Sequence, residues 1–357
     1  MSRPTVRLLT VLLFVSLWVV PYVTAQEDGL QVSQKESGPR PLRPSPSSSG
    51  MSQPGQPPTQ PGMPQSGQPP YTMGGPQTGQ QDGDFQGSLG KGGHKRYVPS
   101  LSNPFVNETP YITTEIRPIY MYHNLPDNIP AAGVRGGNIN LWAVQLRVAL
   151  SQRFGFILNK SGWADVNLNV PGMDDDAFTN LGFGFKYALV DEPRQGSLIT
   201  AGLTYEAPSG GLKAGGTWLQ GNGEGFLSPF FTALETTNKV SVQALFGAKF
   251  ALDRDANTSF FHYALHMDYE MVPGFFPLVE FNGFIPIDEG NRTPYAFEGL
   301  DLFSTGAENP ASVITFAAGS RFKLGKNLLA GVAYEIPLTD DEDILDWRLT
   351  ADLVIRY

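Results

Sequence analysis

The chain has no cysteine among its 357 residues. This absence excludes disulfide bonds, thiolate metal sites, cysteine nucleophiles and a lipid-modified cysteine. Charged residues are also few, at 17% of the chain, and the formal net charge is −9. We therefore expect no nucleic-acid partner, and the composition indicates no cofactor.

Long apolar runs are missing as well. After Ala25 no uninterrupted apolar stretch is long enough for a helix that spans a membrane. Before it, Arg3 and Arg7 precede an apolar run over residues 8–20, and small residues lead to Ala25. This pattern predicts a secretory signal peptide over residues 1–25. A membrane role would then have to come from β-strands.

Residues 26–99 are rich in Pro, Gly, Gln and Ser. Such a segment has too few apolar side chains to offset its ordering entropy, so it is predicted to be a disordered linker. It would serve either as a tether or as an arm that contacts cell-wall polymer or fills the barrel mouth. The basic cluster at its end, residues 92–96, is expected to be solvated.

From Tyr111 onward, apolar and polar side chains alternate in segments of about nine to eleven residues, the length of a tilted membrane-crossing strand. The pattern predicts an all-β fold over residues 100–357: a transmembrane antiparallel β-barrel of about 12 strands. Links between the segments alternate in length, as in outer-membrane barrels. Tight turns are expected at residues 151–153, 191–196, 237–239, 272–275 and 325–327, and longer links at residues 124–138, 161–177, 208–225, 252–258, 288–311 and 339–345.

The last segment, Trp347 to Tyr357, shows the alternation most clearly, with Val354 as its one exception. Its apolar positions and final aromatic resemble the terminal signal by which the outer-membrane barrel assembly machinery recognises its clients. The predicted assembly-signal residues are Leu349, Ala351, Leu353, Ile355 and Tyr357. Expected partners are thus this machinery and outer-membrane lipid.

The opposite face of the segments is polar and carries charges of both signs. The predicted pore-lining residues are Glu115, Arg117, Arg147, Lys186, Glu206, Lys249, His262, His266, Asp268, Glu270, Glu280, Arg321, Lys323, Glu335, Arg348 and Asp352. These charges would either pair across the lumen as a salt-bridged plug or line a narrow conduit for a small solute. Because neither sign dominates, strong ion selectivity is not expected.

The histidines suggest no metal or catalytic site. His262 and His266 lie on one face of a predicted strand, but four residues along a strand span roughly 13 Å, too far to chelate one ion. No serine and histidine are placed together on the lipid-facing side, as a membrane-embedded hydrolase would need. The chain is therefore not expected to be an enzyme.

Four stretches carry a resemblance to a known family. They are Asn180–Tyr187, Gly202–Gly211, and the pair Asn327–Leu329 with Tyr334–Leu338. They resemble the outer-membrane family named for the MetA pathway of phenol degradation, although the usual Gly-Asp after the first glycine is missing. The resemblance implies a barrel suspected of moving hydrophobic or aromatic compounds. We therefore expect a passive channel for small solutes, and the alternative is a plugged structural barrel that engages the cell wall.

Overall fold

The computed structural model describes residue 94, residues 96–127 and residues 135–357. The predicted signal peptide and all of the predicted linker up to residue 93 lie outside this part of the chain. The strands are β1 (Glu115–Leu125), β2 (Gly137–Ala149), β3 (Phe154–Lys160), β4 (Gly162–Leu168), β5 (Asp175–Phe178), β6 (Leu181–Glu192), β7 (Ser197–Ala207), β8 (Lys213–Ala214), β9 (Thr217–Trp218), β10 (Phe226–Thr236), β11 (Val240–Ala251), β12 (Ser259–Tyr269), β13 (Phe275–Asp288), β14 (Val313–Lys323), β15 (Leu328–Pro337) and β16 (Trp347–Arg356).

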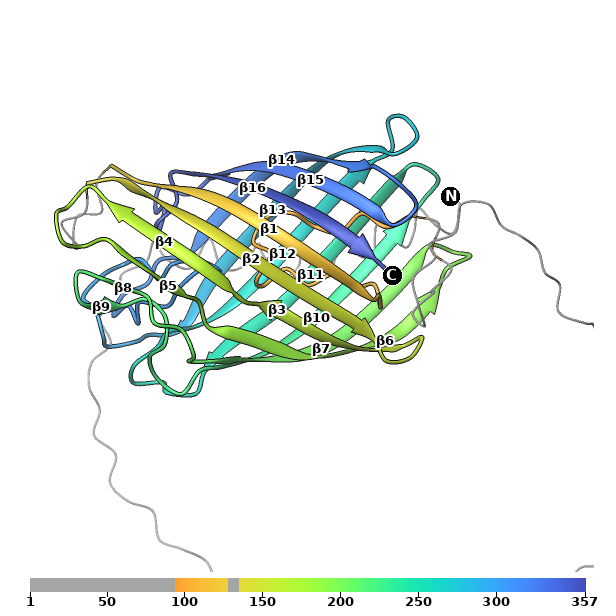
Figure 1. The fold of residues 1–357 in the computed structure, drawn as a ribbon. Helices are drawn as coiled ribbons and strands as arrows, with labels where there is room; N and C mark the ends of the chain where they lie inside the picture. Colours follow the sequence, from red (N-terminus) through yellow and green to blue (C-terminus); the bar gives the residue numbers. More distant parts are fainter. Residues whose placement is uncertain (1–93, 95, 128–134) are drawn as a thin grey trace, which may run out of the picture. The chain divides into compact units, whose positions relative to one another are not determined.

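The strands form one closed antiparallel barrel (Figure 1). β1 pairs with β2 on one side and with β16 on the other, which closes the sheet. β3 and β4 both pair with β2 and are two halves of one barrel strand, while β5 and β6 are the halves of the next. The barrel therefore has 12 strands, which confirms the predicted fold. β8 and β9 form a separate small hairpin within a loop.

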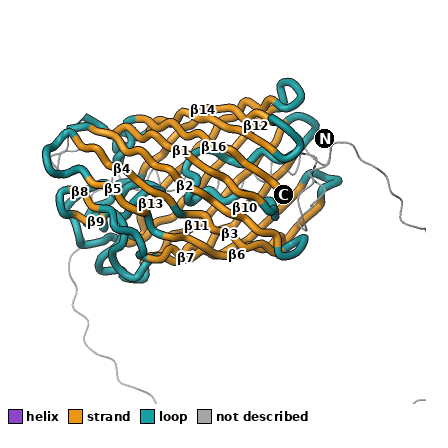
Figure 2. The backbone as a smooth tube through the Cα atoms, in the orientation of Figure 1, coloured by secondary structure: helices purple, strands orange, loops and turns teal. Residues whose placement is uncertain are grey.

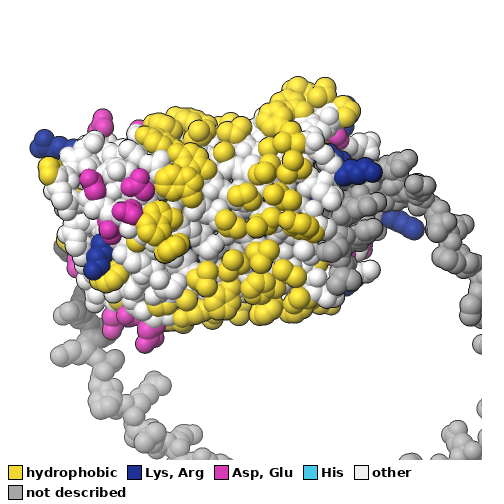
Figure 3. All heavy atoms as spheres, in the orientation of Figure 1, with side chains coloured by type: hydrophobic (Ala, Val, Ile, Leu, Met, Phe, Trp, Pro, Cys, Tyr) yellow, Lys and Arg dark blue, Asp and Glu magenta, His cyan; other side chains and the backbone are white. Residues whose placement is uncertain are grey.

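Alternation along each strand separates a buried lumen face from an outer apolar face. In β16, Arg348, Thr350 and Asp352 are buried, whereas Leu349 and Ala351 are partly exposed. Figure 3 shows the resulting apolar band on one side of the barrel, with charged side chains gathered toward the rim. Hydrocarbon outside a polar interior accounts for this arrangement, which is that of a membrane-spanning barrel.

Short turns and long loops lie at opposite ends of the barrel (Figure 2). The short connections, such as those between β6 and β7 and between β10 and β11, share one end with Tyr357. The expected link at residues 161–177 is wrong, because β4 and β5 extend two barrel strands and leave only residues 169–174 between them. The first strand was also predicted from Tyr111, but β1 begins at Glu115.

Two groups of buried apolar side chains lie at the two ends of the interior. At the short-turn end is a ring that we call the apolar collar: Tyr97, Val98, Tyr111, Ile112, Ala149, Ala188, Leu198, Leu234, Phe276, Leu329 and Val354. The exceptional Val354 of the last strand is thus explained, because it packs inward against this collar. Toward the long loops, a second cluster joins Phe105 to side chains of β1, β2 and β4. No helix in the described part of the chain is long and apolar enough to cross a membrane.

Candidate functional site

The lumen is filled by the chain segment that precedes β1, residues 94 and 96–114, which we call the plug. It enters at the short-turn end, where His94 Nε2 lies 2.9 Å from Asp191. It turns back at Asn103, whose carbonyl accepts hydrogen bonds from the backbone N–H groups of Val106 and Asn107 at 3.2 and 2.9 Å. The return leg then runs back to β1. The plug therefore closes the middle of the barrel as a hairpin.

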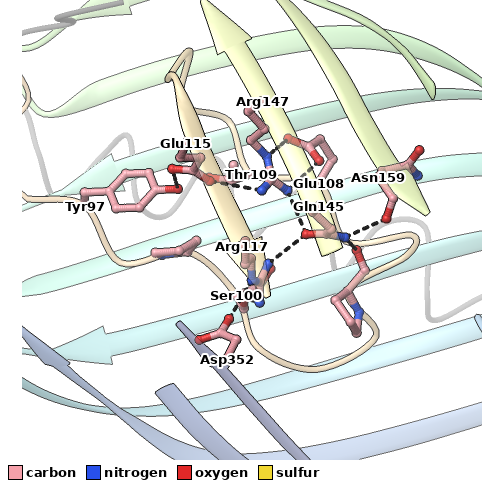
Figure 4. A network of polar contacts seen from close by, with 12 residues as sticks. Tyr97, Ser100, Glu108, Thr109, Glu115, Arg117, Gln145, Arg147, Asn159 and Asp352 are labelled. Carbon is pink, nitrogen blue, oxygen red and sulfur yellow. Dashed lines mark hydrogen bonds and ion pairs between the residues drawn. The ribbon is translucent and has the colours of Figure 1, made fainter. Parts of the chain in front are cut away.

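Arg147 and Lys186 of the wall hold the return leg, and both bind the plug carboxylate of Glu108; Figure 4 shows the contact with Arg147. Arg147 of β2 donates to this carboxylate from Nε at 2.7 Å and from Nη2 at 2.8 Å. Lys186 of β6 donates to Glu108 at 2.7 Å and to the Thr109 carbonyl at 2.8 Å. A third Arg147 nitrogen, Nη1, reaches Glu115 at 3.0 Å. The geometry is a bidentate guanidinium clamp reinforced by an ammonium group.

A second group of wall arginines holds the inbound leg. Arg117 and Arg321 share the carboxylate of Asp352, at 2.5 Å from Arg117 Nε and at 2.8 and 2.9 Å from Arg321. Both arginines also donate to the carbonyl of Ser100, at 2.8 and 3.0 Å. The carbonyl of Pro99 accepts a further bond from Arg321. Backbone carbonyl oxygens of the plug thus accept hydrogen bonds from guanidinium N–H groups that do not bind Asp352.

Acidic side chains on another part of the wall accept plug donors. Glu280 accepts the backbone N–H groups of Leu101 and Ser102 at 2.8 and 2.6 Å, and lies 2.6 Å from His266 Nδ1. Asp268 pairs with Arg96, so this residue is buried rather than solvated as the sequence suggested. Charges of both signs on the wall are therefore matched by the plug.

Two further ion-pair groups lie nearer the long-loop end. Lys160 and Lys249 share Glu206, at 2.8 and 3.0 Å. Arg348 pairs with Glu335 and with Asp301, at 2.7 Å each. Asp301 belongs to the loop between β13 and β14, so this loop folds inward to meet the wall.

Most of the predicted pore-lining residues lie buried in the lumen with polar partners, but two lie elsewhere and one lies in the lumen without such a partner. Lys323 is exposed at the end of β14, and Glu270 is half-buried in the turn after β12. His262 is buried in the lumen, but neither of its ring nitrogens has a partner in hydrogen-bond geometry.

The sequence interpretation missed Lys160, which ends an irregular strand segment with a register shift. It also missed Glu108 and Asp301, which lie outside the strands where alternation carries no information. Unlike most of the strand residues, Glu108 and Asp301 lie in no sequence pattern that indicates a place in the lumen.

An apolar pocket of about 60 Å³ opens at the long-loop end of the lumen. It is lined by Leu125, Ile139, Val166, Leu168, Met173, Ala214, Thr217, Leu219, Tyr295, Phe297, Phe303, Thr305 and Ile344. Tyr295 and Phe297 stack with ring centroids 4.8 Å apart and planes 10° apart. Several lining residues belong to the apolar cluster that also holds Phe105, at the turn of the plug. The pocket and the plug tip are therefore joined by continuous apolar packing.

The loop between β13 and β14, residues 289–312, covers this mouth, and two buried carboxyl groups hold it in place. Asp343 accepts the backbone N–H groups of Glu298 and Gly299 at 2.8 Å each. Glu298 accepts Ser304 Oγ at 2.5 Å and the Ala307 N–H at 3.1 Å. Burial raises the pKa of Glu298 to about 7 and that of Asp343 to about 6. We call this loop the lid.

The polar groups of the lumen are largely engaged with one another. All four histidines are buried, and His266 is engaged with Glu280 and Asp268. Among the described residues no group of three or more His, Cys, Asp or Glu side chains could hold a metal ion. The arrangement can bind charged and apolar groups of a solute and can exchange ion pairs.

Comparisons with known proteins give structural similarity only. No family model matches the sequence, and no curated protein matches it. The COG4313 outer membrane channel from Pseudomonas putida F1 is 13% identical, with a TM-score of 0.49, over 68% of this chain and 95% of that one. The KdgM porin is 13% identical, with a TM-score of 0.39, over 68% and 99%. The translocator domain of the autotransporter NalP from Neisseria meningitidis is 8% identical, with a TM-score of 0.37, over 68% and 89%. These low values do not show membership of the family that the sequence resembles.

Proposed function

We propose that the protein is a passive channel of the outer membrane for small solutes, hydrophobic or aromatic ones among them, and that the plug closes it. The apolar pocket at the long-loop mouth is the observation that carries the proposal. Concave apolar sites with a few polar groups are where small molecules bind, and a barrel with a purely structural role has no need of one. The apolar band and the long loops at one end support the outer-membrane location, with the pocket facing outward.

A solute in the pocket would lie next to the plug tip. Phe105 at that tip packs in the same cluster as Phe303 and Ile344, which also line the pocket. Deeper in the lumen the plug is held largely by hydrogen bonds and ion pairs, which water or a polar solute can replace one by one. Displacement of the plug along this path would open a conduit lined by the predicted charged residues.

The second candidate is a structural barrel that is permanently closed. It is favoured by the buried ion pairs on several sides of the plug, such as those of Glu108 and Arg96. Buried pairs of this kind make a rigid interior, and removing one partner leaves an uncompensated charge.

Conductance of the full-length protein in planar bilayers separates the two candidates. Wild-type protein is expected to open rarely, and Glu280→Gln to raise the open probability at least about tenfold, because the plug loses charge-assisted hydrogen bonds to that carboxylate. Glu289→Gln is the matched control, since Glu289 is exposed just beyond β13. If neither wild type nor Glu280→Gln passes ions or solute, the structural role is supported instead.

A further inference from the structure

The side chains that bind the carboxylate of Glu108 all belong to the wall of the barrel. Arg147 presents two parallel N–H donors to the carboxylate at 2.7 and 2.8 Å, and Lys186 adds a third donor at 2.7 Å. These side chains come from β2 and β6, whereas Glu108 belongs to the plug. A planar guanidinium fork with an adjacent ammonium group recognises any carboxylate of suitable access, whether or not it belongs to the chain.

Without Glu108 the wall would carry excess positive charge at this place. Arg147 would keep Glu115 at 3.0 Å, but the hydrogen bonds of Lys186 go to Glu108 and to the Thr109 carbonyl, both of the plug. Two buried cations would then share one carboxylate. An unpaired buried charge is costly, so withdrawal of the plug favours the binding of another anion here.

Two small cavities of about 20 Å³ each border Glu108. One small cavity borders Glu108 and is lined by Phe105, Phe230 and Lys249 among others. A second also borders Glu108 and includes Leu245 and Ala264. Both linings combine apolar and polar side chains, so the space that the withdrawn plug would leave beside them suits a small organic acid better than a bare inorganic ion.

We propose that Arg147 and Lys186 form a carboxylate-binding site for small organic monocarboxylates with an apolar body, which Glu108 fills from within while the barrel is closed. This inference rests on the proposed channel function, because the solute reaches the site only when the plug moves. Glu108 thus acts as an internal substitute for the carboxylate of the solute.

Benzoate binding to the full-length protein in detergent tests the site. Glu108→Ala is expected to bind benzoate at least about tenfold more tightly than wild type, since the internal competitor is gone. Benzyl alcohol, which has a similar shape and no charge, should show no such gain. The double variant Glu108→Ala with Arg147→Gln should lose the gain, and Glu289→Ala, an exposed control, should behave as wild type.

Failure to assemble is also informative. Glu108→Gln keeps the volume of the side chain and is measured in parallel. If either variant assembles only when benzoate is present during refolding, the site is supported. The proposal is overturned if folded variants bind benzoate no better than wild type, if benzyl alcohol gains equally, or if benzoate rescues neither variant. The binding measurement does not depend on flux. A gain in benzoate affinity together with absent conductance would therefore support the carboxylate-binding site and contradict the channel function.

Discussion

The lid should loosen as pH rises, because it is held by carboxyl groups that burial keeps protonated. Burial raises the pKa of Glu298 from 4.5 to about 7 and that of Asp343 from 3.8 to about 6. In an opened lid both groups would return to ordinary values. The closed lid therefore binds protons more tightly, so its stability is complete below about pH 4 and is lost as pH rises toward 7.

The magnitude follows from the shift of Glu298. A difference of about 2.5 pKa units corresponds to roughly 3 kcal/mol, most of which falls between pH 5 and pH 8. Roughly 3 kcal/mol is about a hundredfold change in the equilibrium between closed and open lid. Asp343 adds to this loss in the lower part of the range.

Hydrogen exchange of the lid amides, followed by mass spectrometry, measures this equilibrium. After correction for the intrinsic pH dependence of exchange, protection of residues 293–308 should fall about a hundredfold from pH 5 to pH 8. Glu298→Gln should remove most of this fall, because its amide does not titrate. Glu308→Gln is the control, since Glu308 is exposed in the same lid. Equal protection at both pH values in wild type, or an undiminished fall in Glu298→Gln, would refute the reasoning.

Three further changes test the barrel itself. Arg348→Met leaves the buried carboxylate of Glu335 without its main cation and should cost about 3–5 kcal/mol, seen as a lower unfolding midpoint in guanidinium; an unchanged midpoint would contradict this. Gly202→Ala places a Cβ 2.2 Å from the ring of Phe230 and 2.8 Å from the carbonyl oxygen of Phe185, and should cost about 1–3 kcal/mol by the same measurement; an unchanged midpoint would contradict this as well. Tyr357→Ala should lower the fraction of heat-modifiable, assembled barrel in outer membranes without changing the stability of the barrel that does assemble; an equal assembled fraction would remove Tyr357 from the assembly signal.

The alternation of apolar and polar residues predicted the barrel because each side chain of a strand matches the polarity of the surface that it faces. Lipid on one side and a charged lumen on the other fix the character of neighbouring residues, as in β16. Even Phe226–Thr236, which Pro229 interrupts, forms strand β10. In its pairing with β11 the register has no partner for Pro229, so the missing N–H is tolerated.

In the part of the barrel beyond the lipid, the apolar side chains point inward instead of outward. There the predicted long link at residues 161–177 was wrong. In β4, Ala164 and Val166 are buried while Trp163 and Asp165 are partly exposed. The extension of the barrel encloses the apolar pocket and faces water outside, so its apolar residues point inward. Because the apolar residues of this stretch face inward, its pattern does not match that of a lipid-facing strand, and the sequence predicted a long link over residues 161–177.

The contacts of the plug could not be predicted from local sequence, and an arm that fills the barrel mouth was only one of the alternatives for the segment before the strands. Its partners are distant along the chain: Arg96 pairs with Asp268, 172 residues away, and Asn103 bonds to Arg348, 245 residues away. The segment has no repeating pattern, and its Pro and Gly neighbours favoured a solvated linker. The charges of both signs on the predicted lumen face were expected either to pair across the lumen as a salt-bridged plug or to line a narrow conduit.

The apolar collar has a consequence for leakage. An ion that reached it would have to shed its hydration shell against side chains such as Leu198, Phe276 and Val354. Narrow apolar constrictions expel water and stop conduction without any moving charge. In the proposed channel, ion pairs in mid-lumen could therefore exchange partners without leakage, and conduction would begin only after Tyr97 and Tyr111 have left the collar.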